Sequence, residues 1–206
     1  MIFKLYTLLE AADVDTSPDT KQVREIVSKI HQEYLKYTKN GKAGNQNCQL
    51  CTWAAEMQFR GEDVLPRPIY SPRDKALTVD GYRIVQSSKK LHIKSKDDVV
   101  SILEEAGPGS RFYTHVNWKN SEGGHEFIIM NINKRVYLVD AQAGVFTSIK
   151  SNRANKYFEI NWSNSFLVRM DDKPVNRGIL KYNDESYLLP WDDEKDMAYL
   201  KAHHML

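Results

Sequence analysis

The two cysteines of the chain lie three positions apart, as Cys48 and Cys51 in the stretch NQNCQLCTWAAEM at residues 45–57. Three kinds of chemistry use such a pair. It can supply half of a zinc site, it can act as a C-x-x-C redox pair, or one thiol can be a nucleophile while the other packs behind it. The rest of the sequence is needed to choose among these three hypotheses.

The rest of the sequence gives little support to the hypotheses of a zinc site or a redox pair. A zinc site needs four ligands, and the six histidines form no second C-x-x-C or H-x-x-x-H pair with which to complete one. A redox pair usually follows a strand of a βαβ unit, whereas an amide-rich loop precedes Cys48 here. The nucleophile reading is therefore favoured, and a binding module that keeps the motif only for packing stays open.

The helix that begins at Cys48 separates the two thiols. Asn47 is a good N-cap, Gly61 is a good stop, and the sequence between them predicts a helix from Cys48 to about Arg60. The free backbone N–H groups and the dipole at a helix start favour an anion, and so a thiolate at Cys48. Cys51 lies one turn deeper on the apolar face, where a thiol is more often a core residue.

A histidine and an aspartate follow in GGHEFIIMNINKRVYLVDAQAG, residues 123–144. His125 stands at the start of one apolar strand and Asp140 at the end of the next, with a hairpin turn expected at 131–134. The start of the first strand then lies beside the end of the second, so the two side chains are within reach of each other. A carboxylate in that position fixes the histidine tautomer and stabilises the imidazolium. Together with Cys48 this predicts a Cys-His-Asp hydrolase site.

The elements that must position these residues are helices in the first half and strands in the second, which indicates an α+β fold. Apolar residues spaced three or four positions apart predict the helices. Alternating apolar and polar residues, or short apolar runs, predict the strands. The expected helices are Thr20–Lys39, Cys48–Arg60 and Lys96–Ala106, the last capped by Ser95; the expected strands are a short one at Tyr82–Val85, then Arg111–Trp118, Glu126–Ile132, Arg135–Val139 and Phe166–Met170.

The pattern N-C-x-x-C-x-x-A-x-E-x-x-x-R-G-x-D-V, followed by G-H and by D-x-Q-x-G, resembles the papain-fold toxin family. This family includes glutamine deamidase domains of bacterial effectors and polymorphic toxins, and related domains near phage head genes. The residues that carry the resemblance are Asn47, Cys48, Cys51, Ala54, Glu56, Arg60, Gly61, Asp63, Val64, His125, Asp140, Gln142 and Gly144, with a Pro-Gly-x-Arg step at Pro108–Arg111.

The resemblance implies a papain-like α+β fold, in which the nucleophile helix packs on an antiparallel sheet. It also implies the roles at the site: Cys48 as nucleophile, His125 as general base and Asp140 as the residue that orients it. The backbone N–H of the nucleophile would form an oxyanion hole with a second donor. Candidates for this donor, or for support of the site, are Asn45, Gln46 and Gln142, and Cys51 is the alternative nucleophile.

The function implied is that of a protein glutamine deamidase or amidase acting as a toxin or effector. Alternatives with the same fold are a cysteine protease, a transglutaminase, and an inactive binding or phage-associated module. No cofactor and no metal are expected. The expected partners are a protein substrate and an immunity or inhibitor protein. Toxin domains usually end a long chain, so a sequence that starts with Met favours a free-standing effector or a phage-encoded protein.

Bulk composition restricts the remaining classes. The chain has 206 residues, 41% of them hydrophobic and 27% charged, and a formal net charge of +2. Such a balance does not predict binding to nucleic acid, and no apolar run reaches the roughly 18 residues of a membrane span. The N-terminus does not resemble a signal peptide, so we expect a cytoplasmic protein or one exported without a cleaved signal. The expected division is 1–40 as a helical extension of the same domain or separate from it, 41–190 as the hydrolase domain, and 191–206 as a charged tail.

Overall fold

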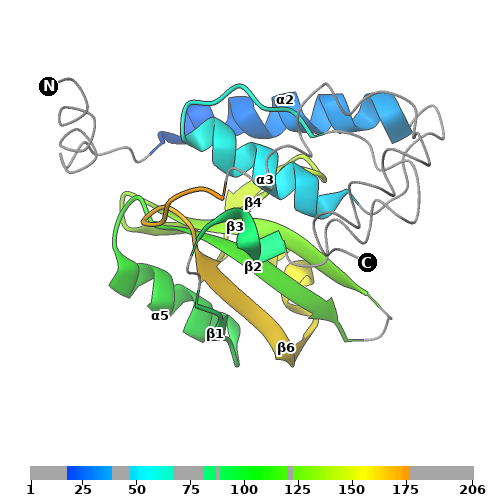
Figure 1. The fold of residues 1–206 in the computed structure, drawn as a ribbon. Coiled ribbons are helices and arrows are strands. Elements are labelled where there is room, and N and C mark those ends of the chain that lie inside the picture. The colour runs from blue at the N-terminus through cyan, green and yellow to red at the C-terminus, as the bar shows by residue number, and fades with distance from the viewer. Residues whose placement is uncertain (1–17, 39–46, 67–80, 87–88, 120–122, 177–206) are drawn as a thin grey trace, which may run out of the picture.

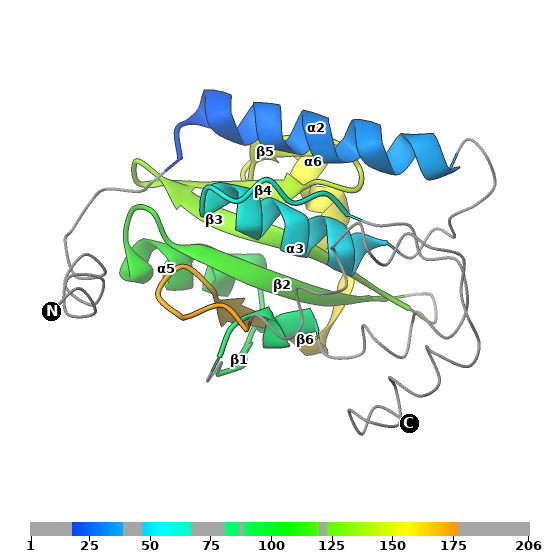
Figure 2. The same ribbon diagram turned by 45° about the horizontal axis from the view of Figure 1, so that its top comes forward.

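A computed structural model describes residues 18–38, 47–66, 81–86, 89–119 and 123–176. A six-stranded antiparallel sheet in the order β1-β6-β2-β3-β4-β5 forms its centre. Helices cover both faces: α2 and α3 lie on one and α5 and α6 on the other (Figures 1 and 2). The fold is therefore α+β, as expected. The helices are α2 Thr20–Thr38, α3 Cys48–Phe59, α5 Lys96–Ala106 and α6 Asn152–Asn155, the 3-10 helices are η2 Gly81–Ile84 and η3 Lys156–Phe158, and the strands are β1 Leu91–His92, β2 Arg111–Trp118, β3 Gly124–Ile132, β4 Arg135–Asp140, β5 Val145–Ser148 and β6 Ile160–Arg169.

Helix α3 is the most buried of the described helices. It lies beside α2 on one face of the sheet (Figure 2), against β3 and β4, and its side chains are buried on nearly every side. Trp53 anchors the neighbouring segment by donating from its indole N–H to the carbonyl of Gly81, at 2.7 Å. The start of α3 is thus held in place by packing along its whole length.

Helix α2 packs on α3 with the apolar face that its spacing predicts. Val23, Val27 and Ile30 are buried in the same cluster as the α3 side chains and the facing residues of β3 and β4. Most of the polar residues of α2 stay exposed or half-buried. The helix thus shares the core of the domain that contains Cys48.

The β3–β4 hairpin sets the register of the candidate site. Its turn contains Asn133 and Lys134, whose φ angles of 50° and 65° give the left-handed conformation that suits two-residue hairpin turns. From that turn the strands pair through to Ile128 opposite Val139, which puts Asp140 opposite Phe127. The expected hairpin is confirmed. Asp140 lies diagonally across from His125, which is two residues before Phe127 on β3 and therefore on the same face of the sheet.

Helix α5 on the opposite face begins as predicted. The hydroxyl of Ser95 accepts a hydrogen bond from the N–H of Asp98, at 3.0 Å, which is an N-cap contact. Gly107 follows the helix with φ of 85°. Val99 and Leu103 then pack into the second core cluster, between α5 and the sheet.

Several expectations were wrong or incomplete. Tyr82–Val85 is not a strand: Gly81–Ile84 forms a 3-10 helix packed against α3, and Val85 makes only one bridge, to Val175. Asn47 stands at the N-cap position of α3 but makes no capping hydrogen bond with its side chain, because its backbone, with φ of −93° and ψ of 13°, lacks the extended conformation of a capping residue. Strands β1 and β5, helix α6 and the first half of β6 were not predicted, and the tail at 191–206 lies outside the described residues.

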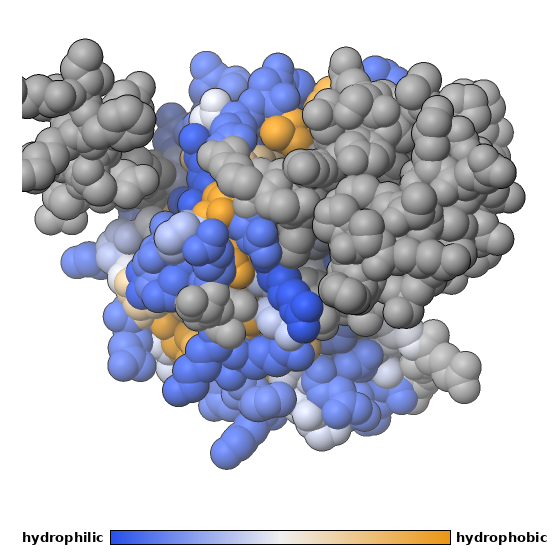
Figure 3. Space-filling model, viewed as in Figure 1, coloured by the Kyte–Doolittle hydropathy of each residue, from blue (hydrophilic) through white to orange (hydrophobic). Residues whose placement is uncertain are grey.

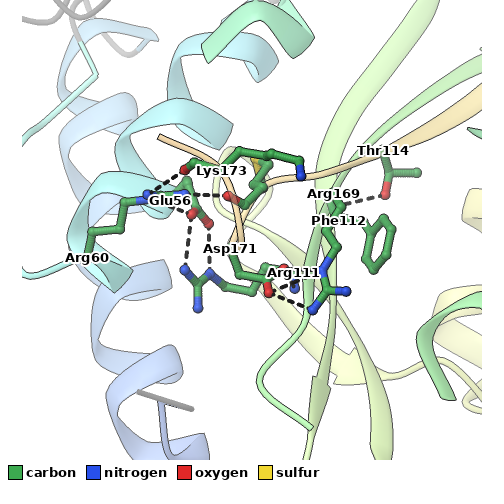
Figure 4. Close-up of polar contacts among 9 residues, drawn as sticks. Glu56, Arg60, Arg111, Phe112, Thr114, Arg169, Asp171 and Lys173 are labelled. Carbon is green, nitrogen blue, oxygen red and sulfur yellow. Dashed lines mark hydrogen bonds and ion pairs between the residues drawn. The ribbon is translucent and has the colours of Figure 1, made fainter. Parts of the chain in front are cut away.

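A buried ion-pair cluster joins α3 to the sheet (Figure 4). Glu56 is fully buried and accepts two hydrogen bonds from Arg111, from Nε at 2.8 Å and from Nη2 at 3.1 Å. Arg60 donates from Nε to the same carboxylate at 2.7 Å and also reaches the carbonyls of Met170 and Lys173. These motif residues therefore tie together α3, the start of β2 and the segment after β6.

The described surface in the view of Figure 1 is largely hydrophilic, with hydrophobic side chains in small interrupted areas (Figure 3). Within the described ranges, none of the helices has the length and apolar content needed to cross a membrane.

Candidate active site

Cys48 occupies the first position of α3 and is only half-buried. The first N–H groups of a helix have no partner inside the helix, so the backbone at Cys48 presents donors and the positive end of the helix dipole. Thr52 holds this turn against the sheet. Its hydroxyl lies 2.8 Å from the carbonyl oxygen of Cys48 and 3.0 Å from that of Glu126. The start of α3 is thereby fixed beside the start of β3.

His125 lies between the cysteine and the aspartate. Its Nε2 is 2.7 Å from Oδ2 of Asp140, and its side chain lies close enough to Cys48 to interact with the thiol. Because Nε2 faces the carboxylate, Nδ1 is the ring nitrogen left for the thiol. The structure therefore brings together all three residues that the sequence singled out, from α3, β3 and β4.

Asp140 has a full set of hydrogen-bond donors although it is buried. Oδ2 accepts from the hydroxyl of Tyr157 at 2.7 Å, in addition to its contact with His125. Oδ1 accepts from the backbone N–H of Ala143 at 3.0 Å. A buried carboxylate is stable when its oxygens are paired in this manner. Its orientation toward the imidazole is thus determined from both sides.

Aromatic rings enclose the imidazole. Trp118 stacks on it with ring centroids 5.9 Å apart and 18° between the planes. Phe127 and Tyr157 lie against it at 5.8 Å and 6.0 Å. Side-chain packing of this kind keeps a catalytic histidine in one orientation and limits the access of water to its hydrogen bond with Asp140.

The electrostatics of the site favour a charged pair. Burial by itself would lower the pKa of His125, but its hydrogen bond with Asp140 and its interactions with Asp140 and Cys48 raise that pKa to about 10. Burial likewise opposes ionisation of Asp140, yet its contacts with His125, Ala143 and Tyr157 hold the pKa of the carboxyl below its ordinary value. The imidazole is then protonated and the carboxylate ionised at neutral pH.

Cys51 lies deeper in the fold, as its position one turn along α3 suggested. It is fully buried. Burial, together with the proximity of Asp140 and Cys48, raises the pKa of its thiol well above the ordinary value. A thiol in this setting stays neutral and behaves as a small apolar side chain. The environment therefore favours Cys48 over Cys51 as the nucleophile.

Of the remaining candidate residues, the structure describes Gln142 but not Asn45 or Gln46. Gln142 is buried in the turn after β4, and its carbonyl oxygen accepts a hydrogen bond from Nδ1 of His31 on α2, at 2.7 Å. Gly144 follows with φ of 64°, and a Cβ there would come within 2.7 Å of the His31 ring. Asn45 and Gln46 lie outside the described residues. Among the residues that the structure describes, no group of three or more metal-ligating side chains is placed to hold an ion.

Tyr157 and Trp118 contact the site but were not among the sequence-based candidates. Trp118 ends a strand that was predicted, but its place beside His125 follows from the pairing of Val116 with His125, which no local signal in the sequence indicates. Tyr157 lies in η3, a single turn without periodicity, so no pattern in the sequence places it beside Asp140.

Residues 46–145 match the model of a protein family described as papain fold toxin 1, glutamine deamidase. The match confirms the resemblance drawn from the motif, and with it a papain-like α+β fold in which the cysteine lies on helix α3. It also supports an enzyme of the deamidase kind and a protein as its target. Comparison with curated proteins and with solved structures found no match.

Proposed function

We propose that this protein is a cysteine-dependent glutamine deamidase that acts on a protein as a toxin or effector. The observation that carries the proposal is the position of His125, which is hydrogen-bonded to Asp140 on one side and interacts with Cys48 on the other. A nucleophile, a base and an orienting carboxylate in that order are the parts that covalent amide hydrolysis requires. Residues 46–145, which contain all three, match a family described as a glutamine deamidase.

The first half of the reaction breaks the C–N bond of the carboxamide. The Cys48 thiolate attacks the side-chain carbonyl carbon of the glutamine, and a C–S bond forms. The His125 imidazolium gives its proton to the departing nitrogen, so ammonia leaves and a thioester remains. The negative oxygen of the intermediate would accept from the backbone N–H of Cys48 and from a second donor, for which we propose Asn45 or Gln46.

The second half returns the enzyme to its starting state. Neutral His125 takes a proton from water, the hydroxide adds to the thioester, and the C–S bond breaks. The products are a glutamate side chain and the regenerated thiolate–imidazolium pair. Asp140 keeps the imidazole oriented and stabilises its charge in both halves, and Tyr157 in turn positions Asp140. For Gln142 we propose a supporting role in the turn that supplies the N–H of Ala143.

The same three residues would also serve proteolysis or transfer to an amine, so the choice of reaction rests on the family match. An inactive module is the remaining alternative. We further propose that α2 belongs to the hydrolase domain, because it shares the core with α3 and because His31 contacts Gln142. An immunity protein as partner, and a route of export without a cleaved signal, are part of the same proposal.

The test is deamidation of a glutamine-containing protein or peptide by the wild-type chain and by Cys48→Ala. Ammonia release is measured, and mass spectrometry locates any glutamate that replaces a glutamine. We expect conversion by the wild type and none by Cys48→Ala, with Cys51→Ala retaining activity. Cleaved peptide bonds without ammonia release would identify a protease instead, and activity that persists in Cys48→Ala would refute the assignment of the nucleophile.

A further inference from the structure

Three aromatic side chains line a groove beside the candidate active site. Trp118, Phe158 and Trp162 contribute to it where the end of β2 meets η3 and the start of β6. The rings of Phe158 and Trp162 stack, with centroids 6.0 Å apart and 10° between the planes. All three side chains are partly exposed. Rigid aromatic side chains that remain accessible in a groove are typical anchors for a protein partner.

Trp118 connects this groove to the reacting groups. One face of its ring stacks on His125, and the same residue lines the groove. A polypeptide whose glutamine side chain reaches Cys48 has to lie next to His125. The neighbouring residues of that polypeptide then cross Trp118 and enter the groove. Continuity with the candidate site thus points to the substrate itself as the occupant.

The charges around the groove indicate what kind of segment it would accept. Lys119 and Lys156 are exposed and line it. The ammonium group of Lys96 lies over the Phe158 ring, 5.6 Å from its centroid. Among the described residues of the lining, Glu159 is the single acidic one. A rim with excess positive charge favours acidic partners and disfavours basic ones.

Most of the groove lies outside the segment that matches the family, whereas the candidate catalytic residues lie inside it. Cys48, His125 and Asp140 lie inside the matched segment 46–145, whereas Lys156, Phe158 and Trp162 lie beyond it. A shared catalytic centre with a separate surface for recognition is how one fold serves different substrates.

We infer that this groove binds an extended acidic segment of the substrate protein, with an aromatic or apolar side chain, next to the target glutamine. The inference rests on the proposed function. The apolar side chain packs between Trp118 and the Phe158–Trp162 pair. The acidic side chains lie against Lys119 and Lys156, and this placement brings the carboxamide to Cys48.

Binding can be measured without turnover by using the Cys48→Ala variant. The probe is a fluorescein-labelled peptide with one glutamine, flanked by glutamate residues and one phenylalanine, and the matched probe has lysine in place of each glutamate. Fluorescence anisotropy should show at least about tenfold tighter binding of the acidic peptide, and this preference should shrink in high salt. Equal binding of the two peptides would overturn the inference.

Two groove variants and one control locate the binding site. Trp162→Ala should weaken binding of the acidic peptide about tenfold by removing an aromatic anchor, and Lys156→Glu should weaken it by a similar factor. Lys21→Glu makes the same charge reversal at an exposed position on α2, on the other side of the sheet, and should leave binding unchanged. Groove variants that bind like the control would refute the inference.

Ammonia release by the wild type separates this inference from the proposed function. If the acidic peptide binds through the groove but no ammonia is released, the groove assignment stands and the deamidase proposal fails. If both peptides are deamidated equally well, and Trp162→Ala and Lys156→Glu behave like wild type, the deamidase proposal stands and the groove assignment fails.

Discussion

The buried ion pair between Glu56 and Arg111 allows a quantitative prediction. It concerns what the motif residues other than Cys48, His125 and Asp140 contribute to the stability of the fold. Removing one partner leaves a buried charge without its main counterion, which typically costs about 3–5 kcal/mol. In Arg111→Met the carboxylate of Glu56 still keeps its bond from Arg60, so we expect the lower end, about 3 kcal/mol. For a chain of this size about 1 kcal/mol shifts Tm by about 2–4 °C, so Tm should fall by about 6–12 °C.

The assay is thermal unfolding followed by circular dichroism, with chemical denaturation as a second measure of stability. Arg169→Met is the matched control, because Arg169 is paired with Asp171 but its side chain is 35% exposed. Exposed pairs contribute little, so this variant should lose less than about 1 kcal/mol. The double variant Glu56→Leu/Arg111→Met removes both buried charges and should be more stable than Arg111→Met alone.

Two results would refute this reasoning. One is an Arg111→Met variant whose Tm equals that of wild type, since the pair would then contribute nothing. The other is a variant that stays folded at low temperature but whose Cys48 no longer reacts with iodoacetamide. That result would give Arg111 a part in the chemistry rather than in the fold.

Three further predictions concern the site. Tyr157→Phe removes one hydrogen bond to Asp140, worth about 1.5–3 kcal/mol because the acceptor is charged. The variant should lower kcat/KM at least about tenfold with little change in KM, and an unchanged pH–rate profile together with full activity would contradict this. The pKa of His125 is raised to about 10 from about 6.5 in the unfolded chain, so its stabilisation is complete below about pH 6.5 and is lost as the pH rises through about 10. Denaturation across this range should show that loss in wild type and not in His125→Ala. Gly144→Ala should destabilise by at least about 1 kcal/mol, since it adds a clash with His31 to a left-handed φ, and an unaffected Tm would contradict the contact.

The positions of the candidate site residues could be predicted because local signals fix each of them. Asn47 and Gly61 delimit the helix that begins with Cys48. The Asn133–Lys134 turn sets the hairpin register, and this register brings the start of β3 beside the end of β4. Each of these signals lies within a few residues of the element that it determines.

The rest depends on contacts between distant segments. Glu56 and Arg111 are 55 positions apart, and nothing local indicates that they meet. Strand β5 and helix α6 span four residues each, too few for a periodic pattern. The predicted strand at Tyr82–Val85 fails because packing against α3 outweighs the preference of four residues for an extended chain.

The central claim is that Cys48 and His125 form a reactive pair, and alkylation tests it most directly. The measurement is the rate of iodoacetamide addition by intact-mass spectrometry, from about pH 5 to about pH 9, for wild type, Cys48→Ala and His125→Ala. We predict that one thiol of the wild type reacts rapidly even in the acidic part of this range, and that both substitutions abolish this reaction. Slow and equal reaction of both thiols, or rapid reaction that survives in His125→Ala, would contradict the account.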